Sequence, residues 1–137
     1  MKPNNEEIKY YKEIFKQMFD FIKKYFNRNE LKYPTIVLNY VKQNDDMFIK
    51  TGYFDPNTKQ IVLFMDGRHK KDIGRSFFHE CCHYIQDIDG VIDKSGYTGD
   101  KITEDKNLVK LEEEAYLKGN MAFRSWTEEE QKKGKLK

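Results

Sequence analysis

The sequence has few cysteines, few histidines and almost no surplus of charge. Its two cysteines, Cys81 and Cys82, are adjacent, and neighbouring residues of a helix cannot easily meet disulfide geometry. We therefore expect no disulfide scaffold. We expect a reducing, cytoplasmic compartment. The 25 basic and 23 acidic residues leave a net charge of +2, which predicts no strong non-specific binding to nucleic acid.

Long apolar runs are also missing. No stretch approaches the ~18 consecutive apolar residues that a membrane-spanning helix needs, and the charged N-terminal segment MKPNNEEIKYYKE does not resemble a secretory signal. We therefore expect neither a membrane span nor a signal peptide. Aromatic residues, by contrast, make up 15% of the 137 residues, and charged residues 35%. This composition favours a single small folded domain over residues 1–137.

Apolar residues spaced three and four apart predict an amphipathic helix over residues 5–26. The apolar stripe consists of Ile8, Tyr11, Phe15, Met18, Phe19, Ile22 and Phe26. We expect this stripe to pack into the core of the domain. Basic residues flank it, so contact with a membrane surface is the weaker alternative.

Three strands are predicted between residues 35 and 65. The segments 35–41, 47–54 and 60–65 are rich in β-branched, aromatic and other large apolar side chains. The residues DPNT at 55–58 are typical of a turn and predict an antiparallel hairpin between the second and third strands. We expect a small, mostly antiparallel sheet, with the third strand at an edge where an extended peptide can pair with it.

Two further helices complete the predicted fold. One covers residues 73–88 and begins at Asp72 as its N-cap, and the other covers residues 104–123, after a glycine-containing loop. Thr127 is expected to cap a separate short turn of helix. The order of elements predicts an α+β fold with an N-terminal helix, a small sheet and two C-terminal helices.

The predicted helix over residues 73–88 contains HECCH at residues 79–83, the pattern H-E-x-x-H. Residues four apart share a helix face, so His79 and His83 can bind one metal ion. Glu80 projects beside that ion and can take a proton from water that zinc has acidified. The pattern predicts a zinc site with Glu80 as general base. The alternative, two surface histidines that are four apart by chance, fits poorly with the apolar residues on both sides.

A catalytic zinc requires a third protein ligand and an open position. Gln86 and Asp89 occupy the positions where a metzincin would carry Gly and its third His, so that class is excluded. His69, which precedes the motif, is one remaining donor. Ligation by Cys81 or Cys82 is a weaker alternative, because buried cysteines usually behave as small apolar residues.

The glutamates at residues 112–114 are the most attractive third donors. Glu112 lies between Leu108 and Ala115 at the border of the predicted apolar face, which favours it as the ligand, with Glu114 next. Taken alone, this triplet would be typical of a solvated helix face. The H-E-x-x-H motif at residues 79–83 is the reason to consider these glutamates as metal ligands.

These residues resemble those of the gluzincins, the thermolysin-like zinc metallopeptidases. In that family a downstream helix supplies a Glu ligand, followed three positions later by a small residue; EEEAY at residues 112–116 fits, with Glu112 as ligand and Ala115 as the small contact. Tyr116 stands where the family usually has Asp or Asn to hold a ligand histidine. The segment HECCHYIQ followed by EEEA is also similar to small bacterial and phage metallopeptidase-like proteins and to ImmA/IrrE-type peptidases.

The resemblance covers roughly residues 35–123 and implies a minimal zincin-like fold with an active-site helix and a ligand helix. It implies one zinc ion bound by His79, His83 and Glu112, with Glu80 as the base that assists hydrolysis of a peptide or protein substrate. The candidates for stabilising the oxyanion are Tyr97, Tyr116, His69 and Arg124. The alternative function is a zinc-binding interaction module with little or no peptidase activity, since so short a chain gives a shallow cleft. A larger protein partner that completes the cleft is compatible with either function.

Overall fold

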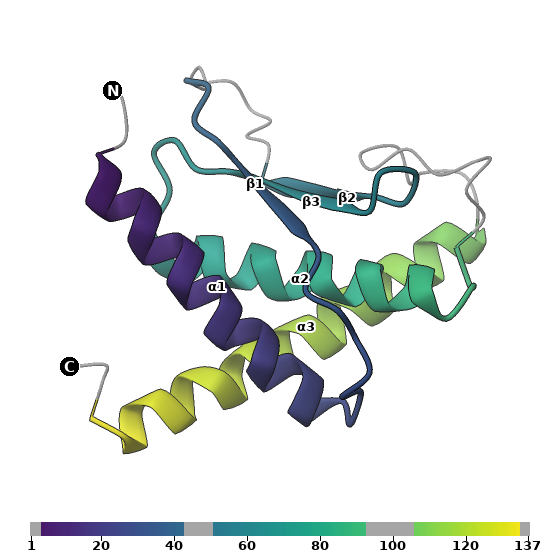
Figure 1. Ribbon diagram of the computed structural model, residues 1–137. Coiled ribbons are helices and arrows are strands. Elements are labelled where there is room, and N and C mark those ends of the chain that lie inside the picture. Colours follow the sequence, from purple (N-terminus) through teal and green to yellow (C-terminus); the bar gives the residue numbers. More distant parts are fainter. Residues whose placement is uncertain (1–3, 43–50, 93–105, 135–137) are drawn as a thin grey trace.

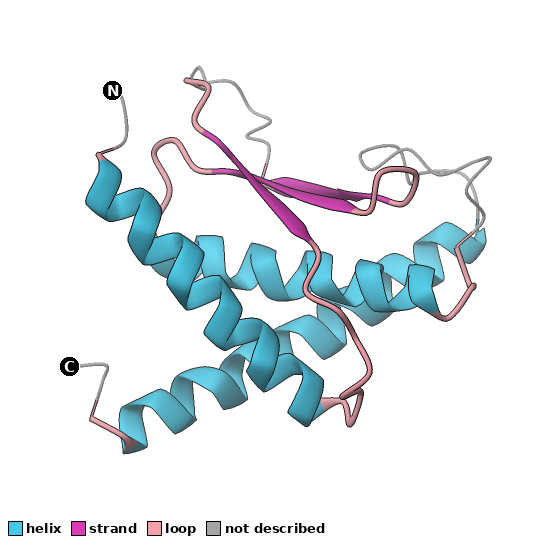
Figure 2. Cartoon of the chain, in the orientation of Figure 1, coloured by secondary structure: helices cyan, strands magenta, loops and turns pink. Residues whose placement is uncertain are grey.

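The computed structural model describes residues 4–42, 51–92 and 106–134. These residues form three helices and a three-stranded sheet, which confirms the predicted α+β class (Figures 1 and 2). The elements are α1 (Asn5–Tyr25), β1 (Thr35–Asn39), β2 (Gly52–Asp55), β3 (Gln60–Phe64), α2 (Lys70–Ile88) and α3 (Lys106–Lys132). Residues 47–50 of the second predicted strand and residues 104–105 of the last predicted helix lie outside the described residues.

The sheet is mixed rather than mostly antiparallel. Its strand order is β1-β3-β2, with β1 parallel and β2 antiparallel to β3. The predicted hairpin of the second and third strands is confirmed, but β3 is the central strand and not the expected edge. The unbroken apolar run of β3, with Ile61, Val62 and Leu63 all buried, is typical of a strand covered on both faces. The edge strand beside α2 is β2.

The core forms where the sheet and α1 pack against α2, while α3 packs along α2 on the side away from the sheet (Figure 1). Phe15 of α1 stacks on Phe77 of α2, with ring centroids 4.6 Å apart. Phe54 of β2 and Ile22 of α1 are also fully buried. Each such side chain contributes about 1.5–3 kcal/mol through burial, so aromatic residues hold α2 in the middle of the molecule.

The N-terminus of α2 lies three residues earlier than the sequence predicts. The N-cap is His69 and not Asp72, because the His69 side chain accepts a hydrogen bond from the Lys71 N–H at 3.1 Å. Asp72 lies in the first turn, where a carboxylate favours the positive end of the helix dipole, and it pairs with Arg75 at 2.7 Å.

The α3 helix is longer than predicted and continues past residue 123 to Lys132. Thr127 does not cap a separate turn. Its hydroxyl donates to the Arg124 carbonyl oxygen at 2.8 Å, so the hydroxyl is satisfied within the continuous helix.

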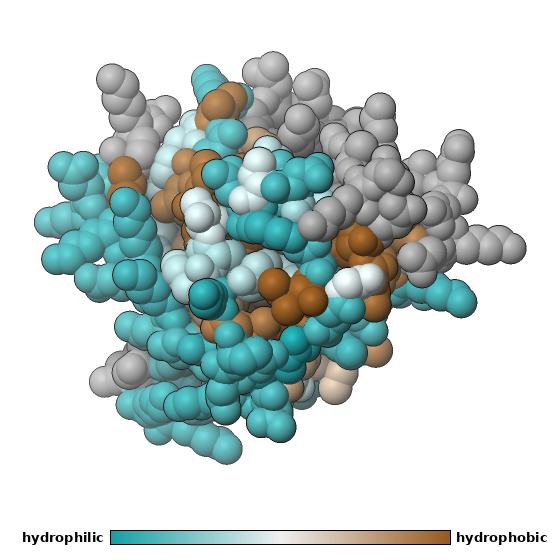
Figure 3. All heavy atoms as spheres, turned by 45° about the vertical axis from the view of Figure 1, so that its right-hand side comes forward, coloured by the Kyte–Doolittle hydropathy of each residue, from teal (hydrophilic) through white to brown (hydrophobic). Residues whose placement is uncertain are grey.

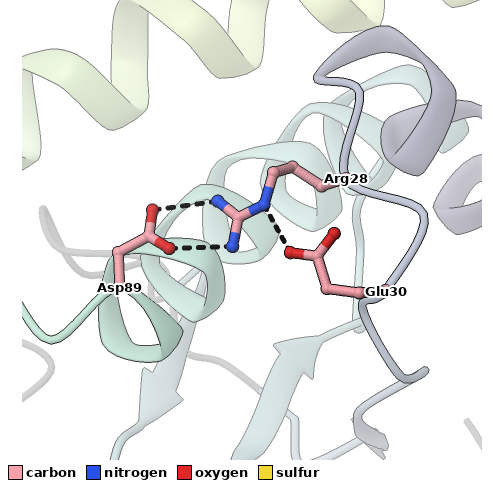
Figure 4. A network of polar contacts seen from close by, with 3 residues as sticks. All are labelled: Arg28, Glu30 and Asp89. Atoms are coloured by element: carbon pink, nitrogen blue, oxygen red, sulfur yellow. Dashed lines mark hydrogen bonds and ion pairs between the residues drawn. The ribbon is translucent and has the colours of Figure 1, made fainter.

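An ion-pair network ties the end of α2 to the segment after α1 (Figure 4). The Arg28 guanidinium donates two hydrogen bonds to the Asp89 carboxylate, at 2.9 and 2.8 Å, and one to Glu30 at 2.6 Å. Asp89 is the C-cap of α2, so this fork holds the C-terminal end of the helix in place.

Figure 3 shows one face on which hydrophilic side chains surround separate hydrophobic ones. Among the described residues, no helix combines the length and the apolar character needed to cross a membrane.

Candidate metal centre

Three side chains of the H-E-x-x-H motif converge at the centre of α2. One ligand atom from each of His79, Glu80 and His83 lies within 4.8 Å of the others. The two histidines are one helical turn apart, and their rings meet edge to face with centroids 4.9 Å apart. The structure therefore brings together the three motif residues that the sequence predicts to act together.

Glu112 of α3 completes this cluster. Its Oε1 contacts Nε2 of His79, and its Oε2 lies 3.3 Å from Nε2 of His83. Ala115 is fully buried against the rest of the molecule, which turns Glu112 toward α2 while Glu113 is exposed. Glu112 is thus the member of the acidic triplet that reaches both histidines.

The chemistry of these donors suits a zinc ion, which accepts imidazole nitrogen and carboxylate oxygen. Oε2 of Glu112 and Nε2 of His83 are 3.3 Å apart, close to the roughly 3.4 Å between neighbouring ligands of a tetrahedral zinc, whereas Oε1 of Glu112 contacts Nε2 of His79 directly. Burial opposes ionisation of Glu112, but the hydrogen bonds from His79 and His83 outweigh it and lower the pKa of the carboxyl to about 2. The carboxylate is therefore ionised at every physiological pH, as metal ligation requires.

Glu80 lies beside the histidines and is almost completely buried. Its carboxylate accepts a hydrogen bond from the Phe54 backbone N–H of β2. Burial raises the pKa of Glu80, although the nearby His83 and His79 act in the opposite direction. A buried carboxylate with an elevated pKa and a fixed position is well suited to accept and hold a proton.

Gln86 fixes the orientation of His83, a role that the sequence analysis did not assign. The Nδ1–H of His83 donates to Oε1 of Gln86 at 2.8 Å, which leaves Nε2 directed at Glu112. Nε2 of Gln86 in turn donates to the Leu111 carbonyl oxygen at 2.9 Å and to Glu114 at 3.0 Å. Glu114, the alternative third ligand, therefore contacts Gln86 and supports the histidine indirectly.

The Nδ1 side of the His79 ring is held by packing, whereas its Nε2 contacts Glu112. The Tyr116 ring lies against the imidazole, with centroids 4.5 Å apart. Within the part of the chain that the structure describes, the buried Nδ1 of His79 has no hydrogen-bond partner. The side chain that lies against His79 is thus the Tyr116 ring, at the position where the gluzincins that the sequence resembles usually have Asp or Asn.

Gly119 of α3 allows the two helices to approach each other at His79. A Cβ atom at this position would lie 3.2 Å from the His79 Cα and 3.3 Å from its backbone nitrogen. Glycine inside a helix costs about 1 kcal/mol relative to alanine, so an isolated glycine in a helical pattern is a signal of close packing. The sequence carries this signal at Gly119, inside the helix predicted over residues 104–123.

The cluster lies in an open cleft of about 680 Å³. The cleft is lined by residues of α2 and α3, by Arg68 just before α2, and by Thr51 and Gly52 at the start of β2. Among the oxyanion candidates, Tyr116 lines the cleft, whereas His69 caps α2 and Arg124 lies further along α3. The fourth candidate, Tyr97, lies outside the described residues.

No family model, curated protein or solved structure matches this chain.

Proposed function

We propose that this protein is a zinc-dependent metallopeptidase in which His79, His83 and Glu112 hold the metal. The observation that carries the proposal is the convergence of the Glu112 carboxylate on Nε2 of both motif histidines from a separate helix. Two imidazole nitrogens and one carboxylate oxygen are a donor set that catalytic zinc uses. When bound there, zinc would act as a Lewis acid on water and on a scissile carbonyl group.

Glu80 is the general base in this proposal. Its carboxylate is held next to the ligand histidines by the Phe54 N–H, and its burial strengthens its affinity for a proton. Glu80 accepts the proton of the attacking water and then transfers it to the nitrogen of the leaving amine. The peptide bond is thereby replaced by a carboxyl group and an amine.

The cleft offers groups that can position a peptide. β2 is the edge strand beside the motif, and its first residue, Gly52, lines the cleft, so an extended substrate can pair with its backbone. Tyr116 packs on His79 with more than half of its surface exposed, which makes its hydroxyl the best placed sequence candidate for stabilising the oxyanion. We place the activity in a reducing, cytoplasmic compartment, because Cys81 and Cys82 are free, buried thiols.

The first test is the metal content of the purified protein. We expect about one zinc per chain in the wild type and in Glu113→Ala, because Glu113 is an exposed neighbour of the site. The Glu112→Ala variant should bind no zinc or bind it much more weakly. A Glu112→Ala variant that retains full zinc would overturn this ligand set.

The second test is turnover of a quenched-fluorescent peptide library by the zinc-loaded protein. Glu80→Gln should retain zinc while its kcat falls by about 100-fold or more, since the side chain keeps its shape but cannot take the proton. Unchanged hydrolysis by Glu80→Gln would sink the mechanism. Full zinc without turnover in the wild type would favour a zinc-binding interaction module.

A further inference from the structure

A second hollow, of about 540 Å³, lies beside the metal cleft between α2 and α3. We refer to it as the basic groove, and its lining residues are Lys71, Arg75, Asn120, Phe123, Arg124, Thr127 and Gln131. Arg75 and Asn120 line both the groove and the metal cleft, so the two hollows are adjacent. The lining contains three cationic side chains and no carboxylate.

The cations of the groove retain hydrogen-bonding capacity. Arg75 donates from Nη1 to Asp72 at 2.7 Å, and Arg124 donates from Nε to Glu128 at 3.1 Å. Each guanidinium carries five N–H donors, so each keeps donors for a further acceptor. In the described part of the chain, Lys71 has no ion-pair partner.

Neighbouring carboxylates do not cancel the positive character of the groove. Asp72 and Glu128 offset two of the three cations and leave one net positive charge. Neither lines the groove, although Asp72 lines the adjoining metal cleft. The Arg75 guanidinium also lies over the buried Phe123 ring, at 5.6 Å from its centroid, which holds it in the floor of the groove.

We propose that the basic groove binds acidic side chains of the substrate, so that the protein selects peptides with Asp or Glu near the bond that it cleaves. This inference rests on the proposed peptidase function, because it places the peptide in the metal cleft. Carboxylates are the peptide groups that match lysine and arginine donors.

The helix spacing sets where the acidic residues should be. Arg75 lies four residues before His79 on α2 and Lys71 eight residues before it, which corresponds to about 6 and 12 Å along the helix axis. An extended peptide advances about 3.3 Å per residue. Acidic residues about two to four positions from the cleaved bond should therefore face the groove.

The test is the binding of two short fluorescein-labelled peptides to zinc-loaded Glu80→Gln protein, followed by fluorescence anisotropy. One peptide carries a run of Asp and Glu, and the other carries Asn and Gln at the same positions. We expect the acidic peptide to bind about fivefold more tightly, with the preference falling as salt is raised. The double variant Lys71→Gln/Arg124→Gln should remove the preference.

The matched control is Lys12→Gln/Lys16→Gln, which removes the same charge from exposed positions on α1. This control should keep the preference for the acidic peptide. Equal affinity for the two peptides, or equal losses in both double variants, would overturn the inference. So would tighter binding of a single-stranded oligonucleotide that the Lys71/Arg124 substitutions abolish. A protein that binds no zinc but keeps the acidic preference would overturn the peptidase and leave the groove as an acidic-peptide site.

Discussion

At the scale of single residues, Gln86 links the two helices of the site. It accepts from His83 on its own helix and donates to Leu111 and Glu114 on α3. A neutral imidazole that donates from Nδ1 must present the lone pair of Nε2, so Gln86 selects the tautomer that a metal needs. The same side chain fixes the ring orientation and the distance between the helices.

We therefore expect Gln86→Leu to weaken zinc affinity by about 10–100-fold. Leucine fills a similar buried space but cannot accept the hydrogen bond from the Nδ1–H of His83. Glu114→Gln is the matched control, because its amide oxygen can still accept from Gln86 and the affinity should change little. A competition titration with a coloured chelator measures both variants. Unchanged affinity in Gln86→Leu would show that packing alone orients His83.

The residues of the His79–Glu80–His83–Glu112 cluster could be predicted from the sequence more readily than the residues that hold them in position. Helical phase relative to Leu108 and Ala115 singled out Glu112, and the structure turns that carboxylate toward both histidines. Gln86 was visible three residues after His83, but its partners on α3 are 25 residues or more away in sequence. Only the packing of the two helices reveals those contacts.

At the scale of elements, the contact between α2 and α3 decides the geometry of the site. Gly119 brings the α3 backbone against His79, and Gly74 of α2 makes room for the Phe123 ring, whose Cε1 would lie 2.7 Å from a Cβ. Each glycine gives up helix propensity for this close approach. The two helices meet through these positions, and their ligands come within reach of each other.

The substitution Gly119→Ala separates the effect of helix propensity from the effect of the close contact between α3 and the His79 backbone. Alanine favours the isolated helix by about 1 kcal/mol, but its Cβ would press on the His79 backbone at 3.2 Å. We expect zinc affinity to fall severalfold while the free energy of unfolding of the metal-free protein changes little. Lys118→Ala, at the exposed neighbouring position, should leave zinc affinity unchanged. Isothermal titration and urea unfolding supply the two readouts.

Element types followed from the sequence, but several boundaries and the strand order did not. Apolar periodicity indicated α1, and turn residues indicated the β2–β3 hairpin. The parallel pairing of β1 with β3 depends on a long-range contact that no local pattern encodes. His69 replaced Asp72 as N-cap because an imidazole nitrogen can also accept the Lys71 N–H.

At the scale of the whole molecule, α2 is the central element. It contacts both other helices and the strands β2 and β3, but not β1. Hydrogen bonds fix both ends of α2. The His69 side chain caps its N-terminus, and the Arg28 guanidinium binds Asp89 at its C-terminus through two hydrogen bonds. Cys81 and Cys82 lie between the motif histidines and are buried, so burial raises the pKa of both thiols, that of Cys82 to about 12.

This burial predicts a loss of stability at alkaline pH. Burial likewise raises the pKa of Tyr11 to about 12 from 10.0, while the ordinary value for Cys82 is 9.0. As pH rises from about 9 to about 12, the unfolded chain releases these protons first, so the free energy of unfolding falls; below pH 9 these groups contribute no pH dependence.

Urea unfolding at a series of pH values tests this expectation. Tyr11→Phe/Cys82→Ala should have a flatter alkaline profile than the wild type, whatever its stability at neutral pH. Tyr10→Phe, which changes an exposed ring on the same helix, should keep the wild-type slope. An equally steep decline in the double variant would assign the alkaline loss to other groups.

The three proposed ligands differ in their access to solvent. The His83 side chain is 3% exposed, whereas those of His79 and Glu112 are 16% and 20% exposed. If zinc binds as proposed, a molecule in the cleft would reach it from the side of Glu112 and His79, and His83 would be the ligand most shielded from solvent. A chelator would then reach the ion through the cleft without separation of α2 and α3.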